Sequence, residues 1–209
     1  EDTAELQVYH DHWLRMETRR ERPDGTPEVD MNDCLKSSLR MRPDRIIVGE
    51  VRSSEAATLL TAMNTGHDGS FGSLHANTAM ETITRMINPP MNVPPIMLTG
   101  LDLIIIQARL YVNGKTARKI TEVAEVAGME GDKPRLNAIW KYNAATDQIE
   151  ETGIPSKMRE TNCTAAGITP AQFEQHVKQR EQILADLLNR DIRDIDTVTK
   201  VIQGFYATR

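Results

Sequence analysis

Three polar clusters in the first part of the chain combine residue types that could act on a phosphate ester. They are Glu1-Asp2, Glu50-Val-Arg52 and His75-Ala-Asn77. Carboxylates can hold Mg²⁺ or orient water, and a histidine can contact a phosphate or a neighbouring carboxylate. Phosphoryl transfer depends largely on such positioning and charge neutralisation. The clusters therefore predict a phosphate-handling site if the fold brings them together.

The middle cluster follows an apolar run that predicts a short strand. Residues 46–48 are Ile-Ile-Val, which is typical of a parallel strand covered on both faces. Gly49 lets the backbone turn or approach a ligand closely just before Glu50. Ligands in open α/β sheets bind outside the carboxyl ends of strands, so Glu50 is a candidate site residue. The alternative is that Glu50 and Arg52 form only a solvated ion pair.

Helices and further strands alternate with this strand. A strand is expected at residues 13–19 and another at 66–77, ending in His75. The first expected helix runs from Met31 to about Arg40, after the cap Asp30, and the second runs from the cap Ser53 to Gly66. The third runs from the capping box Thr78-x-x-Glu81 to Asn88, with Met80, Ile83 and Ile87 directed inward. Short alternation of strand and helix predicts an α/β fold with a mostly parallel sheet.

The second half of the chain shows first a pattern of antiparallel strands and then a pattern of helices. Residues 101–126 predict a β-hairpin with its turn at Asn113-Gly114, and the alternation of Leu136, Ala138, Trp140 and Tyr142 adds an antiparallel strand. From about Ile154 the pattern is helical, with a strong start at Thr169-Pro-Ala-Gln172 and a later helix through Ile202. We therefore expect three parts: an α/β core at 1–100, an antiparallel β-meander at 101–150 and a helical subdomain at 151–209.

Bulk composition narrows the function classes. The net charge of −5 argues against a nucleic-acid partner recognised by bulk electrostatics. No apolar run approaches the roughly 20 residues of a membrane span. Cys34 and Cys163 lack metal-ligand spacing, and no export signal begins the chain, which suits reduced thiols in the cytosol.

Three segments closely resemble motifs of the type II/type IV secretion ATPases, the motors of secretion systems, pili and archaella. Residues 1–6, 39–52 and 62–77 resemble the Asp box, the Walker B motif and the His box of that family, in the same order and spacing. Residues 64–69 are most similar to Tad/Flp pilus motors, whereas residues 88–107 and the helical tail look more like archaeal motors. The resemblance implies a RecA-like P-loop NTPase core that uses ATP and Mg²⁺.

The resemblance also implies roles for individual residues. Glu50 would be the Walker B carboxylate, and Glu1 and Asp2 would help to place Mg²⁺ or the attacking water. The metal would be held through water by these three carboxylates. His75, and less directly His67, would contact or sense the γ-phosphate.

Three arginines beside the motifs are further candidates. Arg40, Arg42 and Arg52 could contact phosphate or a neighbouring subunit. The resemblance implies a hexameric ring at the cytoplasmic face of the membrane, working with an inner-membrane platform protein to drive secretion or the assembly of a pilus-like filament.

The chain departs from the family in one respect. It contains no Gly-x-x-x-x-Gly-Lys-Ser/Thr loop, which the family places before the Asp box. We therefore expect a piece of a motor that binds ATP weakly and does not hydrolyse it alone. One alternative is a non-catalytic interaction or regulatory module that keeps the fold. Another is a metal-dependent hydrolase using His67 and His75, which lack a second ligand cluster of recognisable spacing.

Overall fold

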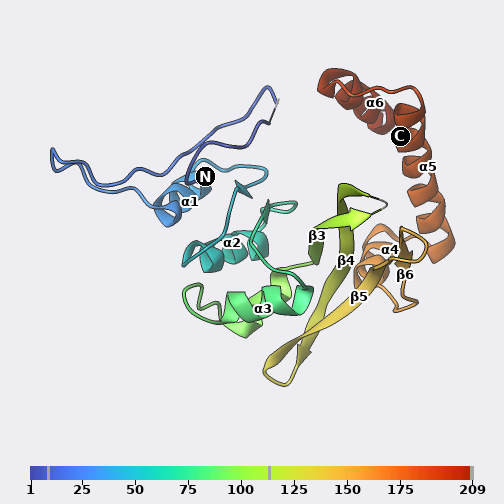
Figure 1. Ribbon diagram of the computed structural model, residues 1–209, viewed down its shortest axis with the longest axis horizontal. Coiled ribbons are helices and arrows are strands. Elements are labelled where there is room, and N and C mark those ends of the chain that lie inside the picture. Colours follow the sequence, from blue (N-terminus) through green and yellow to red (C-terminus); the bar gives the residue numbers. More distant parts are fainter. Residues whose placement is uncertain (9, 113, 208–209) are drawn as a thin grey trace. The chain divides into compact units, whose positions relative to one another are not determined.

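The chain folds into two compact units, as seen in a computed structural model that describes residues 1–8, 10–112 and 114–207 (Figure 1). Unit 1 comprises residues 1–8 and 14–156 and carries all three polar clusters. Unit 2 comprises residues 10–13 and 157–207, and its regular structure is helical. The mixed α/β class expected from the sequence is confirmed.

The three α-helices of unit 1 lie where the sequence predicts them, with a different N-cap at one of them, and a 3₁₀ helix without a predicted counterpart follows. They are α1 (Met31–Leu39), α2 (Glu55–Asn64), α3 (Ala79–Ile87) and the 3₁₀ helix η1 (Pro95–Gly100). Asp30 caps α1 in a complete capping box, as predicted. The prediction that Ser53 caps α2 is wrong, because the N-cap is Ser54 and its side chain makes no capping hydrogen bond.

Helix α3 buries Ile83 and packs Ile87 against the core as expected, but it does not bury Met80. Thr78 caps it through Glu81 N–H, but Met80 is 59% exposed instead of pointing inward. The buried side chains are those of Ala79, Thr82, Ile83 and Met86. Because Ala79 is small and Thr82 is polar, the spacing of large apolar residues does not indicate that these two side chains are buried.

A short parallel sheet delivers the second and third polar clusters. Strands β1 (Ile47–Val48) and β2 (Phe71–Gly72) pair in parallel, with Ile47 opposite Phe71. Backbone hydrogen bonds from Phe71 N to Ile46 O (3.0 Å) and from Ser73 N to Val48 O (3.2 Å) hold the register. The expected strand at residues 13–19 is wrong: among the described residues this stretch forms one isolated bridge, between Arg19 and Val29. Leu14 is 64% exposed there, so the partial alternation has no apolar face to bury.

A four-stranded antiparallel sheet follows, as the sequence predicts. Its order is β3-β4-β5-β6, with bounds Leu103–Val112, Lys115–Glu130, Lys133–Asn143 and Gln148–Glu151. The hairpin turn includes Gly114, whose φ of +77° suits glycine, while the predicted turn residue Asn113 lies outside the described residues. The last strand, β6, has no counterpart in the sequence prediction.

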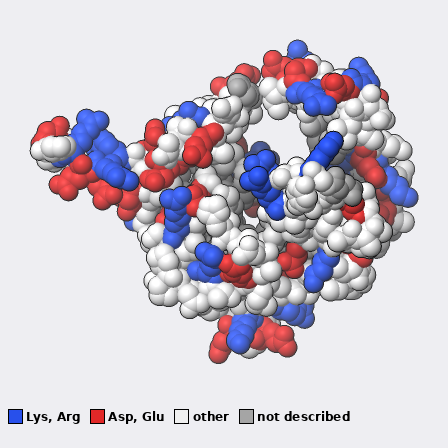
Figure 2. Space-filling view, in the orientation of Figure 1, with Lys and Arg blue, Asp and Glu red and all other residues white. Residues whose placement is uncertain are grey.

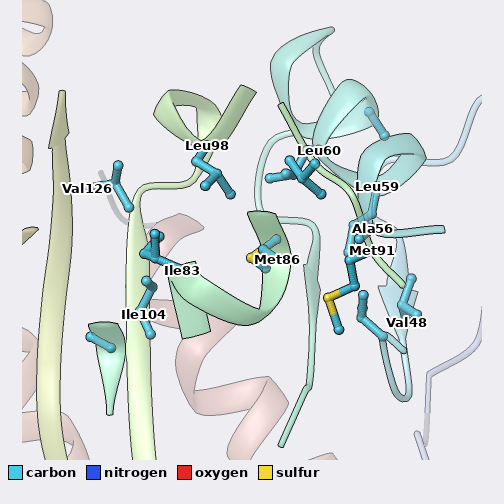
Figure 3. Packing of buried hydrophobic residues seen from close by; sticks show 14 of the residues in the cluster. Val48, Ala56, Leu59, Leu60, Ile83, Met86, Met91, Leu98, Ile104 and Val126 are labelled. Carbon is cyan, nitrogen blue, oxygen red and sulfur yellow. The ribbon is translucent and has the colours of Figure 1, made fainter. Parts of the chain in front are cut away.

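One apolar core joins both sheets and the helices of unit 1. In Figure 3, Met86 of α3 lies between Ile104 on β3 and the side chains on α2 and β1. Leu98 of η1 and Leu60 of α2 are almost fully buried. This core fixes the strands that carry the polar clusters.

An apolar cleft nevertheless separates β2 from β3. It has a volume of about 740 Å³ and is lined by Phe71, Gly72, residues 103–107 and apolar side chains of α2. Strand β2 pairs only with β1, and β3 pairs only with β4 among the described strands. The edges of both strands that face the cleft therefore have no strand partner there.

Unit 2 consists of α4 (Lys157–Ala166), α5 (Pro170–Asn189) and α6 (Ile195–Ala207). The predicted start of α5 is confirmed, since Thr169 and Gln172 form a capping box with Pro170 at the first turn. An ion pair of 2.7 Å between Arg159 and Glu174 links α4 to α5. Among the described residues, no helix combines the length and apolar character needed to cross a membrane.

Candidate functional site

Glu50 lies just after β1, in the loop that leads to α2. Its side chain is 26% exposed and its two carboxylate oxygens contact two different basic side chains. Arg52 Nη2 donates to Oε2, and His75 Nε2 lies 3.2 Å from Oε1. The parallel pairing of β1 with β2 therefore joins two of the three predicted clusters around one carboxylate.

These contacts keep Glu50 ionised. The hydrogen bond from Arg52 lowers the pKa of Glu50 below its ordinary value, against the opposing effect of partial burial. The charges of Arg52 and His75 act in the same direction, whereas the negative charge of Asp2 acts against it. The same hydrogen bond raises the pKa of Arg52. Asp2 is thus close enough to belong electrostatically to the Glu50 group.

Glu1 packs over the backbone beside Glu50. Its side chain is 7% exposed, and a Cβ atom on Gly49 would lie 2.9 Å from Glu1 Cγ. Gly49 therefore admits the side chain of Glu1 instead of a ligand. Glu1 Oε1 accepts hydrogen bonds from Leu6 N (2.7 Å) and Glu5 N (3.0 Å).

These backbone contacts set the charge state of Glu1. Burial pushes the pKa of the Glu1 carboxyl upward, but the N–H groups of Leu6 and Glu5 and the charge of Arg15 bring the net pKa below its ordinary value. In this arrangement the carboxylate orders the turn of residues 1–6.

Asp2 is more open to solvent. Thr18 Oγ1 donates to its Oδ1 at 2.6 Å, and the residue is exposed. Among the described residues, no three His, Cys, Asp or Glu side chains converge as direct metal ligation would require. The oxygen donors of Glu50 and Asp2 suit Mg²⁺ held through water, whereas Glu1 Oε1 is already occupied by two N–H groups.

The side chains of the remaining predicted residues do not contact Glu50 in the part of the chain that the structure describes. His67 follows α2, and its Nδ1 lies 3.3 Å from Ala62 O, at the wall of the apolar cleft. Arg40 is the C-cap residue of α1, and Arg42 has φ +53° in the loop before β1. Both arginines are exposed. His75 and Arg52 are thus the predicted residues whose side chains contact Glu50 directly.

Sequence reasoning missed the residues that hold the Glu50 loop. The buried carboxylate of Glu55 accepts hydrogen bonds from Arg52 N and from Ser53 N (2.7 Å). Ser73 Oγ donates to Gly49 O and so fastens the loop to the end of β2. The spacing of Arg52 and Glu55 is that of an N-cap and its third helical residue, which is the signal that could have identified Glu55.

The family profile described as "Type II/IV secretion system protein" matches residues 1–190. The chain belongs to the type II/IV secretion system family. This confirms the resemblance read from its three motifs.

The relatives include archaeal and bacterial proteins. The uncharacterised protein MJ1287 of Methanocaldococcus jannaschii is 33% identical over 189 residues, which cover 90% of this chain and 69% of that protein. The probable conjugal transfer protein TrbB of Sinorhizobium fredii is 46% identical over 158 residues, or 72% of this chain and 42% of that protein. The chain thus spans only part of these relatives, and just 38% of the related M. jannaschii protein MJ0900.

One of the solved structures that match this chain has a low TM-score. It is a crystal structure of the VirB11 ATPase from the Brucella suis type IV secretion system in complex with sulphate, 30% identical, with a TM-score of 0.40. The match covers 46% of this chain and 32% of that protein.

Proposed function

We propose that this chain is the C-terminal part of an ATPase motor that powers protein secretion or the assembly of a type IV pilus-like filament. The observation that carries the proposal is the ionised Glu50 at the end of a parallel strand, contacted by Arg52 and His75. Family membership and relatives named as conjugal transfer proteins support it.

The charged groups have complementary roles in this proposal. Glu50 would polarise the attacking water and, together with Asp2, would hold Mg²⁺ through water, while Glu1 shapes the adjoining turn. His75 contacts Glu50 at 3.2 Å and is 86% exposed, so it can move between this carboxylate and a phosphate. Bound Mg²⁺ supplies charge neutralisation at the phosphates.

We further propose that residues 1–100 are part of a RecA-like core, that the antiparallel sheet of residues 101–150 completes the motor domain, and that residues 151–209 form a helical subdomain. The facing edges of β2 and β3 across the 740 Å³ cleft support this, because an additional strand there would pair with both. The part of the relatives that this chain does not span is the proposed source of that strand and of the phosphate-binding loop.

The proposals for assembly and location are supported by the same family membership. The full-length protein is proposed to form a hexameric ring at the cytoplasmic face of the membrane and to act on an inner-membrane platform protein. Alone, the 209 residues are proposed to bind ATP weakly and not to hydrolyse it, since they contain no Gly-x-x-x-x-Gly-Lys-Ser/Thr loop.

The test is Glu50→Gln in the full-length protein. Loss of the carboxylate charge is expected to reduce ATP turnover by about 100-fold or more, while ATP binding is retained. Glu130→Gln, which makes the same change at an exposed position at the end of β4, is the matched control and is expected to leave turnover unchanged. Normal turnover in Glu50→Gln would instead favour a non-catalytic module.

A further inference from the structure

A second hollow lies beside the Glu50 group in unit 1. It has a volume of about 350 Å³ and is lined by His75–Asn77, Arg85 and residues 106–109. Gln107 and Arg109 come from the exposed positions of β3, so that strand reaches the polar cluster that follows β2. None of the roles assigned above involves Gln107 or Arg109.

The basic side chains around this hollow differ in whether they contact a carboxylate. Arg85 forms an ion pair with Glu81 at 2.7 Å, and His75 contacts Glu50. Arg109, in contrast, forms no ion pair with any residue that the structure describes. The hollow therefore contains a guanidinium whose five donors remain available to a ligand.

The residue opposite Arg109 in the hairpin also carries a positive charge. Its direct cross-strand partner on β4 is Arg118, and both side chains are exposed. Like charges directly opposite each other in an antiparallel pair are destabilising. The residue opposite Arg109 therefore supplies no counter-charge, which leaves its guanidinium to an acidic ligand.

We propose that this hollow binds a phosphate group, with Arg109 as its principal binding residue and the Gln107 amide as a second donor. The planar guanidinium can donate two parallel hydrogen bonds to phosphate oxygens. The adjoining carboxylate of Glu50 is already paired with Arg52 and His75, which limits its repulsion of the anion. The proposal rests on the proposed function only in identifying the phosphate as part of a nucleotide.

The experiment is a titration of the 209-residue chain with inorganic pyrophosphate, followed by NMR signals of the Gln107 side-chain amide and the Arg109 Nε–H group. The wild-type chain is expected to show saturable changes at both groups. Arg109→Gln is expected to weaken binding by about fivefold or more. Arg118→Gln removes the same charge one strand away, outside the lining of the hollow, and is expected to change binding by less than about twofold.

Both substitutions change exposed side chains and so remove no core packing. Arg109→Lys keeps the charge without the planar fork and is expected to weaken binding less than Arg109→Gln does. Absence of saturation in the wild-type chain, or equal weakening by Arg109→Gln and Arg118→Gln, would overturn the proposal. Because pyrophosphate binding involves no hydrolysis, its failure is distinct from a failure of the Glu50→Gln test.

Discussion

Single residues control the charge of the site through a few short contacts. Glu50 is held between Arg52 and His75, and its depressed pKa keeps it available as a carboxylate. Because the pKa is lowered in the folded chain, the pair contributes stability above the ordinary value of 4.5. That contribution is lost as the pH falls through the lowered pKa. The hydrogen bond from Arg52 is the largest cause of the lowered pKa of Glu50.

Arg52→Gln is expected to raise the pKa of Glu50 toward 4.5, because the hydrogen bond from Arg52 is the largest cause of the depression. Carbon-detected NMR titration of the Glu50 carboxyl group measures the change. Arg40→Gln is the matched control, since Arg40 lies at the C-cap of α1 and is not among the groups that shift the pKa of Glu50. Equal upward shifts in the two variants would mean that overall charge, and not the contact with Arg52, sets this pKa.

The start of helix α2 is held by the side chain of Glu55, a residue of the helix itself, and not by the N-cap residue Ser54. Glu55 is 4% exposed and accepts two backbone N–H groups, those of Arg52 and Ser53. Both N–H groups belong to the loop that precedes the N-cap residue Ser54. The carboxylate thereby joins the helix to the loop that carries Glu50.

Glu55→Ala is expected to lower the free energy of unfolding by about 1–2 kcal/mol, because two backbone N–H groups lose their acceptor. Urea denaturation of the chain measures the loss. Ser54→Ala changes the N-cap residue, whose side chain makes no capping bond, and is expected to stay within about 0.5 kcal/mol of the wild type. A larger loss in Ser54→Ala than in Glu55→Ala would contradict this account of the helix start.

Unit 1 as a whole is built from two sheets that share a core but do not share hydrogen bonds in the described residues. The apolar cleft of about 740 Å³ lies between the facing edges of β2 and β3. A parallel ladder directs alternate residues of a strand toward its neighbour, so Phe71 and Ser73 bond to β1. The amides of Gly72 and Leu74 consequently point toward the cleft side.

Hydrogen exchange is expected to alternate along β2. The amides of Phe71 and Ser73 should exchange about tenfold more slowly than those of Gly72 and Leu74, because only the first pair is hydrogen-bonded to β1. Exchange followed by NMR on the 209-residue chain tests this. In the full-length protein all four amides should be protected if an added strand occupies the cleft. Uniform protection in the 209-residue chain would show that β2 already has a second partner.

Away from the cleft, charge is mixed over the visible surface. In Figure 2, Lys and Arg side chains are interspersed with Asp and Glu on the face shown. Neither sign forms a continuous field on that face. The electrostatics that matter for the proposed functions are therefore local, at Glu50 and at Arg109.

Most elements could be predicted because their signals are local. The capping boxes at Asp30 and Thr169 and the strand alternation of residues 136–142 depend on residues a few positions apart. The predictions that were wrong depended instead on contacts between parts of the chain that are distant in sequence. The stretch 13–19 would have needed a partner strand, and Met80 is exposed because the core contacts the neighbouring stripe of α3.

The sequence by itself determined the α-helices, the antiparallel hairpin, the three polar clusters and membership of the secretion family. Only the tertiary structure decided which of those clusters meet: His75 and Arg52 contact Glu50, Glu1 packs over Gly49, and His67 turns to α2. Spacing along a chain sets which residues share a helix face or a strand end. Contact between segments depends instead on strand pairing and on where a missing side chain, as at Gly49, leaves room.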